Sequence, residues 1–394
     1  MAAVSCNILK GVLIMANLLK YGMVGGGPGS FIGVAHRKAI ALGGKAVLVA
    51  GCFSSKMEKS LKTSEELGIA PERTYSDFKE MAKAEAGKLD FVTIATPNNT
   101  HYACCKAFIE QGINVMCEKP LCFGIDEAEE LVALAKEKDV VFGVMYGYTG
   151  NAMTKFAKQL IAEGKIGDVI NVSAEYPQEW LIDQLDPSTS RTAQMSVWRT
   201  DPKVSGISNC VGDIGTHIEN TVAYVTGLHP KRVAAKVDYF GHPLDLNANI
   251  LVEFNNGASG NFWCSQVAVS HRNGLALRVY GTKGMLEWHE EDCEYLTFCA
   301  KGEAPQKMAR NCGYVYGRAA EVAHIPSGHP EGFYEAFSNI YDSFTSTIAK
   351  KKAGEELTAS DLDVPTCVDG MLGVKYLHAV IDSGKNDSAW REVK

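Results

Sequence analysis

An α/β protein of two domains is what the sequence of 394 residues predicts. We expect a doubly wound, mostly parallel sheet, followed by an α/β domain with a large, open and mostly antiparallel sheet. Three observations predict this fold class. Short apolar runs alternate with helical patterns over residues 21–146, a glycine-rich turn follows the first run, and from residue 233 apolar runs alternate with glycine-rich turns.

The composition excludes several classes of function. A net charge of −7 provides no basic surface for nucleic acid and no polybasic face for a membrane. Residues 8–19 are apolar, but Lys10 interrupts them and no basic region precedes them, so neither a signal peptide nor a span is expected. The twelve cysteines form no C-x-x-C pair, which is typical of reduced thiols in a cytoplasmic protein.

A glycine-rich turn follows the first predicted strand, residues 21–24, and precedes a helical pattern that begins near Gly33. Strand, glycine turn and helix in this order are typical of a dinucleotide site, because bare amides and a helix N-terminus bind pyrophosphate. Ser30 stands at the third glycine position of the fingerprint, and an insertion of three residues offers Gly33 for that role. The candidate cofactor residues here are Gly25, Gly26, Gly27, Phe31 and Ile32.

The second predicted strand, residues 46–50, ends without the acid that usually binds the ribose hydroxyls of NAD. Ser54, Ser55 and Lys56 stand there instead, before a helix over residues 57–67. Small hydroxyls beside a lysine suit a 2′-phosphate, so NADP is not excluded, although we expect NAD.

Two further buried strands carry polar side chains at their carboxyl ends, where parallel sheets bind ligands. Residues 91–95 precede a segment that holds four candidate cofactor residues, and residues 113–117 end on an acid, a lysine and a proline. Helices are expected at residues 101–111 and 124–137, and residues 140–146 are expected as a further strand. The candidates at these strand ends are Thr96, Pro97, Asn98, His101, Glu118 and Lys119.

The second half has a different pattern. A helix over residues 151–163 and a strand over 169–175 precede a long irregular stretch, residues 176–206, of the kind that is usually functional. It carries Trp180, Trp198 and Arg199. Strands are then expected at 233–239, 247–254, 258–266, 275–280 and 285–288, and helices at 334–350 and 365–381.

Asp213 and His217 lie four residues apart, so in a helix they share one face. A histidine titrates near neutrality and is the usual general base for a hydroxyl proton, and a carboxylate can orient it. The alternative is an N-cap aspartate beside a packed core histidine. No third metal ligand stands at a suitable spacing, so no metal is expected.

From about residue 20 to its end, the chain resembles the Gfo/Idh/MocA superfamily, the relatives of glucose–fructose oxidoreductase and inositol dehydrogenase. The resemblance rests on four motifs in order: the glycine run at 25–27, Thr96-Pro97-Asn98 with His101, Glu118-Lys119-Pro120, and Asp213-x-Gly215-x-His217. It implies an N-terminal extension over residues 1–18, a Rossmann dinucleotide-binding domain over 19–147, and a substrate-binding and oligomerisation domain over 148–394.

The resemblance also implies roles for residues. Lys119, Asp213 and His217 would form the catalytic set, with His217 accepting a hydroxyl proton and Lys119 stabilising the developing alkoxide. Tyr148, Trp180, Trp198 and Arg199 would bind the substrate together with Asp213 and His217. The open sheet would form the contact of a homo-oligomer.

The expected substrates are polyhydroxylated: sugars, glycosides or cyclitols. The long loop at residues 176–180 favours C3 of a glucoside by analogy, with a lyase or deglycosidase acting afterwards. Two alternatives remain open: an NAD-dependent glycoside hydrolase that oxidises the ring transiently, and a non-catalytic regulatory protein of the same fold.

Overall fold

The first sheet is fully parallel and has five strands, one at each of the five ranges expected, in the order β2-β1-β3-β4-β5. The computed structural model describes residues 18–185, 197–358 and 360–394. The order reverses between β1 and β3, and ligands bind at the carboxyl ends of strands beside such a point. The strands are β1 (Leu19–Gly25), β2 (Ala46–Cys52), β3 (Phe91–Ala95), β4 (Asn114–Cys117) and β5 (Phe142–Val144).

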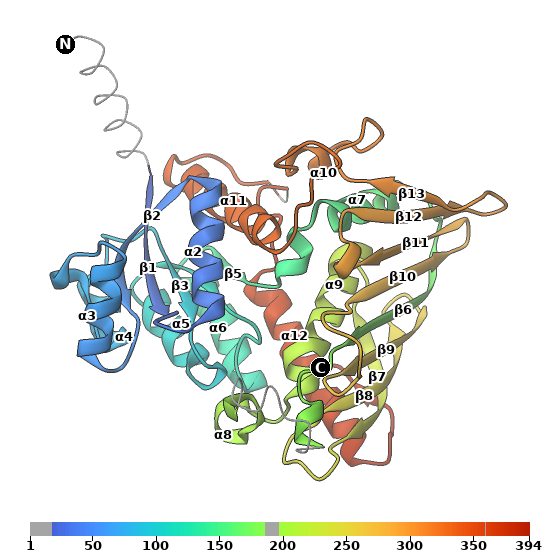
Figure 1. Ribbon diagram of the computed structural model, residues 1–394, viewed down its shortest axis with the longest axis horizontal. Coiled ribbons are helices and arrows are strands. Elements are labelled where there is room, and N and C mark those ends of the chain that lie inside the picture. The colour runs from blue at the N-terminus through green and yellow to red at the C-terminus, as the bar shows by residue number, and fades with distance from the viewer. Residues whose placement is uncertain (1–17, 186–196, 359) are drawn as a thin grey trace.

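Helices cover both faces of this sheet, which is why its strands are apolar on both sides (Figure 1). One face packs against α2 and against α11, a helix from the end of the chain. The other face packs against α4, α5 and α6. The helices are α2 (Phe31–Gly43), α3 (Met57–Glu66), α4 (Phe78–Ala84), α5 (His101–Ile109), α6 (Ile125–Glu137) and α11 (Phe333–Lys352).

The second sheet has nine strands in the order β13-β12-β11-β10-β6-β9-β8-β7-β14. Every neighbouring pair is antiparallel except β6 with β9, as the expected mostly antiparallel sheet requires. The strands are β6 (Val169–Pro177), β7 (Pro230–Asp238), β8 (Asn247–Phe254), β9 (Ser259–Ser265), β10 (Ala276–Gly281), β11 (Gly284–His289), β12 (Tyr295–Ala300), β13 (Gln306–Ala309) and β14 (Arg391–Glu392).

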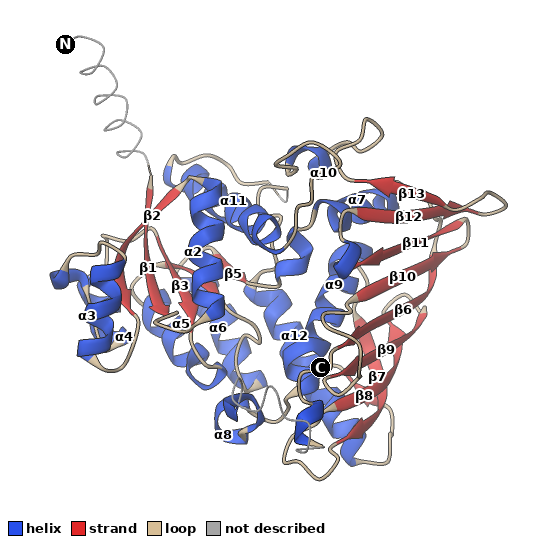
Figure 2. Ribbon diagram, in the orientation of Figure 1, coloured by secondary structure: helices blue, strands red, loops and turns tan. Residues whose placement is uncertain are grey.

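One face of this sheet packs on three helices, and the described helices leave the other face uncovered (Figure 2). Alternation along the strands fits this arrangement: in β8, Ala248, Ile250 and Val252 are buried, whereas Leu251 between them is 58% exposed. The covering helices are α7 (Ala152–Ala162), α9 (Thr216–Thr226) and α12 (Cys367–Lys385), and two short helices are α8 (Pro202–Ser205) and α10 (Arg318–Glu321).

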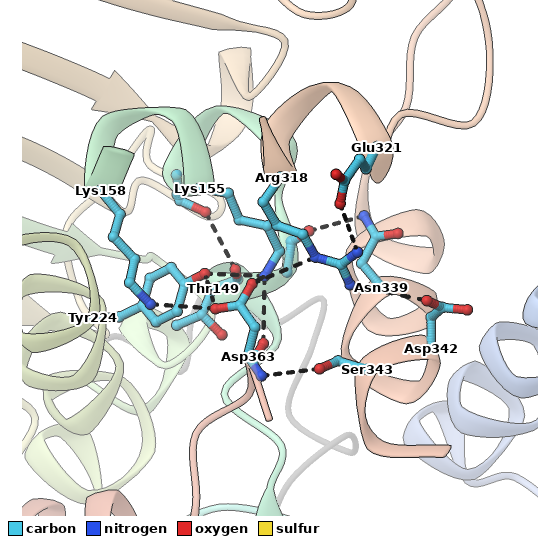
Figure 3. A network of polar contacts seen from close by, with 12 residues as sticks. Thr149, Lys155, Lys158, Tyr224, Arg318, Glu321, Asn339, Asp342, Ser343 and Asp363 are labelled. Carbon is cyan, nitrogen blue, oxygen red and sulfur yellow. Dashed lines mark hydrogen bonds and ion pairs between the residues drawn. The ribbon is translucent and has the colours of Figure 1, made fainter. Parts of the chain in front are cut away.

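A polar network joins the segment between α11 and α12 to the second domain (Figure 3). Asp363 accepts hydrogen bonds from Lys155 (2.6 Å), Lys158 (3.2 Å) and the hydroxyl of Tyr224 (2.8 Å). The buried Lys155 ammonium is desolvated, which lowers its pKa to about 8 although Asp363 opposes the shift. This network lines a cavity of about 810 Å³, whose carboxylates are as numerous as its cations. It therefore presents no excess of charge to a ligand.

No helix among the described residues is both long enough and apolar enough to cross a membrane. Of the sequence-based expectations, the extension over residues 1–18 lies almost wholly outside the described residues.

Candidate active site

The turn between β1 and α2 is built from glycines because no side chain fits there. Gly25 and Gly26 have φ values of +78° and +68°, in the left-handed region that glycine favours. A Cβ on Gly27 would lie 2.7 Å from the carbonyl oxygen of Phe53, at the end of β2. The loop is thus a bare-backbone cradle against the second strand, and it fits the pyrophosphate of a dinucleotide.

The start of α2 explains the irregular fingerprint. The Ser30 side chain accepts a hydrogen bond from the amide of Gly33 (3.1 Å) and is the N-cap of the helix. A Cβ on Gly33 would lie 2.3 Å from the Cα of Gly26. Gly33 therefore takes the third glycine role, close helix–strand packing, as predicted. Phe31 and Ile32, in the first turn, line a cavity.

The segment after β2 lies beside this cradle, since Phe53 contacts Gly27. Ser54 accepts a hydrogen bond from the amide of Lys56 (3.2 Å), and the side chains of Ser55 and Lys56 are exposed. These residues stand at the end of the second strand, where the ribose of a dinucleotide is expected.

The loops after β3 and β4 meet through a buried histidine. His101 is fully buried, and its ring nitrogens lie 2.8 Å from the carbonyl oxygen of Pro120 and 2.9 Å from that of Thr96. Thr96 and Asn98 line the cavity, whereas His101 holds the two loops together from behind. His101 and Pro97 do not line this cavity.

Lys119 and Asp213 lie together although 94 residues separate them. The Nζ atom of Lys119 is 2.8 Å from both the Oδ1 atom and the backbone oxygen of Asp213. Gln266 donates to the other carboxylate oxygen (2.9 Å), and Arg199 Nε lies 3.6 Å from it. Burial alone would raise the pKa of Asp213, but Lys119 and Arg199 lower it well below its usual range. Asp213 is thus an ionised acceptor.

Asp213 stands in a π-helical turn, Val211–Gly215, that runs into α9, and not in the regular α-helix that the sequence suggested. Such wide turns are frequent at functional sites. The fully buried Asp245 accepts hydrogen bonds from the amides of Asn209 (2.9 Å) and Val211 (2.7 Å) and anchors the start of the turn. Asp213 and His217 still line one cavity, so the expected pairing holds although its helical geometry was wrong.

His217 is enclosed by three tyrosine rings. The ring centres of Tyr148, Tyr146 and Tyr176 lie 4.8, 5.6 and 6.0 Å from that of the histidine. Burial, with Lys119 adding to it, lowers the pKa of His217 well below 6.5, while Asp213 opposes the shift. At neutral pH the imidazole is therefore neutral and can accept a proton.

A polar wall faces the histidine. The Asn273 side-chain oxygen accepts from Tyr176 (2.5 Å) and Gln178 (3.0 Å), and its amide nitrogen donates to Tyr148 (3.1 Å). Of these wall residues, the sequence singled out Tyr148 and missed the other three. Tyr176 and Gln178 stand at the end of β6, where strand position is a signal, but nothing in the sequence marks Asn273.

The candidate aromatic residues of the long loop lie farther from the reacting groups. Trp180 donates to Gln178 (2.9 Å), and its ring centre lies 6.0 Å from the Arg199 guanidinium. Arg199 lines the cavity, and Trp180 supports it. The side chain of Trp198 lies outside the described residues.

One cavity of about 380 Å³ collects these groups, at the carboxyl ends of the parallel strands and against the second sheet. On one side it has the first turn of α2 with Thr96, Asn98 and Glu118, and on the other Lys119, Asp213, His217 and the polar wall. A dinucleotide cradle opening onto a lysine, a carboxylate and a neutral histidine defines a dinucleotide-dependent oxidoreductase.

The chain belongs to the Gfo/Idh/MocA oxidoreductases. Residues 19–146 match the oxidoreductase family with an NAD-binding Rossmann fold, and residues 154–287 match the GFO/IDH/MocA C-terminal domain. The expected family, the NAD-binding domain and the dehydrogenase class are confirmed.

Three relatives cover nearly the whole chain. The uncharacterized oxidoreductase YfiI of Bacillus subtilis is 32% identical over 98% of this chain and 100% of its own. An oxidoreductase from Sinorhizobium meliloti is 40% identical, with a TM-score of 0.85, over 95% of this chain and 99% of that one. An inositol dehydrogenase homolog from Azotobacter vinelandii, solved with NADH and myo-inositol, is 32% identical, with a TM-score of 0.86, over 96% and 98%.

Proposed function

We propose that this protein oxidises a ring hydroxyl of a sugar, glycoside or cyclitol with NAD as the acceptor. One observation carries the proposal: Lys119 Nζ lies 2.8 Å from Asp213, and both line the cavity that also includes His217 and the first turn of α2. When bound, NAD supplies a nicotinamide ring that accepts a hydride.

The three side chains have separate roles. The neutral imidazole of His217 accepts the proton of the substrate hydroxyl. Lys119, held by Asp213, places a positive charge where the oxygen becomes anionic, and such electrostatic stabilisation is usually the largest single contribution to catalysis. Asp213 keeps Lys119 in position and binds a neighbouring hydroxyl. Buried tyrosine rings exclude water around the histidine.

The wall chemistry supports a polyhydroxylated ring as the substrate. Amides and phenols at Tyr148, Tyr176, Gln178 and Asn273 offer hydrogen bonds at several points of the cavity. Aromatic faces suit the apolar face of a pyranose. Within this class we prefer C3 of a glucoside, whose 3-keto product a lyase or deglycosidase would consume. The relative from Azotobacter vinelandii, solved with myo-inositol, supports a cyclitol as well.

The test is one absorbance experiment. The purified protein is mixed with NAD or NADP and with myo-inositol, glucose, methyl glucoside or an aryl glucoside, and reduced cofactor is followed. We expect accumulation with NAD, and none in the His217→Ala variant. Release of the aryl group without reduced cofactor would replace this proposal with the glycoside hydrolase, and a preference for NADP above about a hundredfold would reassign Ser54, Ser55 and Lys56 as a phosphate site.

A further inference from the structure

A buried hydrogen-bond chain ends at the edge of the active-site cavity. Its members come from β3, α2, α11 and the end of β4. The Tyr341 hydroxyl lies 3.0 Å from Thr93 Oγ1 and 2.7 Å from His36 Nδ1, and His36 Nε2 lies 2.8 Å from Glu118 Oε1. Thr93 and His36 are completely buried, and Tyr341 is 2% exposed.

The last member, Glu118, connects the chain to the chemistry. Its Oε1 atom accepts from His36, and its Oε2 atom accepts from the backbone amide of Lys119 (3.2 Å). Glu118 also lines the cavity. Burial alone would raise the pKa of Glu118, but His36 and then Lys119 lower it, so the carboxylate is an acceptor at both oxygens.

Such a chain is costly to build into a core. A buried carboxylate destabilises a protein unless hydrogen bonds and charge satisfy it, and a half-satisfied network is worse than an apolar one. Here one carboxylate is held by a chain of three polar side chains from distant segments: His36, Tyr341 and Thr93. That carboxylate adjoins the residue whose Nζ atom reaches Asp213.

We propose that His36 and Tyr341 are positioning residues: through Glu118 they hold the backbone of Lys119 so that its side chain meets Asp213. This inference rests on the proposed function only in treating Lys119 as part of the reaction. Phe337 of the same helix as Tyr341 packs against His36, with ring centres 5.5 Å apart, and lines the cavity. Helix α11, from the C-terminal part of the polypeptide, thus contributes to the active-site cavity.

A matched pair of tyrosine variants tests the proposal. Tyr341→Phe removes the hydroxyl that joins Thr93 to His36. Tyr376→Phe removes an equally buried hydroxyl that has no hydrogen-bond partner in the described residues. Both variants keep the ring, so packing is retained. We expect Tyr341→Phe to lower kcat/KM about tenfold, equivalent to about 1.4 kcal/mol, and Tyr376→Phe to leave it unchanged.

Hydrogen exchange at the Lys119 amide gives a readout that needs no substrate. We expect exchange in Tyr341→Phe to be faster than in Tyr376→Phe at equal melting temperature. Equal exchange in the two variants would overturn the proposal, as would faster exchange with unchanged kcat/KM. If the unaltered protein oxidises none of the test substrates, the proposed function fails, while the exchange comparison still decides the positioning role.

Two substitutions of His36 test whether a hydrogen-bonding group is needed at the position of its Nε2 atom. A glutamine amide can reach the place of Nε2, whereas an asparagine amide reaches only that of Nδ1. We expect His36→Gln to retain more activity per folded molecule, and slower Lys119 exchange, than His36→Asn. Equal losses in the two variants would contradict the role of His36 in holding Glu118; if His36→Asn does not fold, the tyrosine pair decides alone.

Discussion

At the scale of single residues, His217 depends on its neighbours for its protonation state. Three tyrosine rings bury the imidazole, and Lys119 adds a positive charge nearby, so its pKa lies well below the usual 6.5. A histidine kept neutral in this way is ready to accept a proton over the whole physiological range of pH.

His217→Ala and Lys119→Ala should therefore fail in different ways. Loss of the base should lower kcat by about 10²–10⁴-fold. In the unaltered protein we expect kcat to rise with pH below 6.5, because the pKa of His217 is lowered, and His217→Ala should flatten this limb of the pH profile. Loss of the lysine should lower kcat at every pH, because a charge at the reacting oxygen is gone. Steady-state kinetics and melting curves on both variants check this, with Lys158→Ala as the control. A well-folded His217→Ala enzyme with near-normal kcat would remove the histidine from the mechanism.

Glu219, buried in α9, should make stability depend on pH. It is 2% exposed, and burial, followed by the like charge of Asp369, raises its pKa from 4.5 to about 8. A raised folded-state pKa contributes stability that is complete below pH 4.5 and is lost as pH rises towards 8. We expect unfolding in urea to show wild type losing on the order of 4 kcal/mol relative to Glu219→Gln between these values. A constant difference, as for the exposed Glu321→Gln, would mean that Glu219 is ionised throughout.

Residue types decide how much of the site the sequence predicted. A lysine at a strand end and an aspartate four residues before a histidine carry recognisable chemistry, and these three share the cavity. The sequence did not identify Asn273 and Gln178 as site residues, because a side-chain amide has no distinctive chemistry until the fold brings its partners near. Here Asn273 accepts hydrogen bonds from Tyr176 and Gln178. The contacts of the buried His101 ring with the carbonyl oxygens of Thr96 and Pro120 could not be predicted from its residue type.

At the scale of elements, the junction of β1, α2 and β2 leaves little room for side chains. A Cβ on Gly25, Gly27 or Gly33 would meet backbone atoms, which cannot move aside as a flexible side chain can.

Gly27→Val should consequently weaken dinucleotide binding. Its Cβ would lie 2.7 Å from the Phe53 carbonyl oxygen, so the loop must shift away from β2. We expect NADH affinity, measured by fluorescence titration, to fall at least tenfold, about 1.4 kcal/mol, while unfolding stays cooperative. Gly313→Val is a suitable control because nothing lies within 4 Å of its Cβ position. Unchanged affinity in Gly27→Val would refute the assignment of this loop to the cofactor.

The central helices and strands were predictable because their buried positions are apolar and recur with the period of the element. Missed strands lie at the sheet margins: β12 and β13 follow the last expected strand, and β14 has two residues. Edge strands bury less of their side chains, so their apolar signal is weak. The π-helical turn at Asp213 was also invisible, because one extra residue per turn leaves no mark in a short segment.

At the scale of the whole molecule, the open face of the nine-stranded sheet is the surface we predict for assembly. Leu251 is 58% exposed on β8, and Tyr280 is 37% exposed on β10. Antiparallel sheets commonly have one solvated face, but large apolar side chains exposed on such a face are typical of a protein–protein contact.

Leu251→Glu should then lower the molecular mass in solution. An added carboxylate in a buried contact must be desolvated without a partner, which disfavours association. Light scattering over a range of concentrations gives the mass. Val368→Glu, at a 44% exposed site on α12, is the matched control. A protein that is monomeric before the substitution would contradict the predicted assembly outright.

A fragment that ends at residue 147 should not reach the folded state by itself. Its core around Tyr21 and Phe91 is completed by Phe337, Ile340 and Phe344 of α11. We expect the fragment to bind a hydrophobic dye and to bind NADH weakly, and we expect a peptide spanning α11 to reverse both. A cooperatively unfolding fragment with full NADH affinity would show that α11 is dispensable.

This return of the last helices to the first sheet sets an order for biosynthesis. The amino-terminal strands leave the ribosome early, yet α11, the helix that covers one of their faces, is made only after eight of the nine strands of the second sheet. During that interval an apolar surface stays open to solvent or to chaperones. The first sheet therefore cannot be fully covered until most of the second domain has been synthesised.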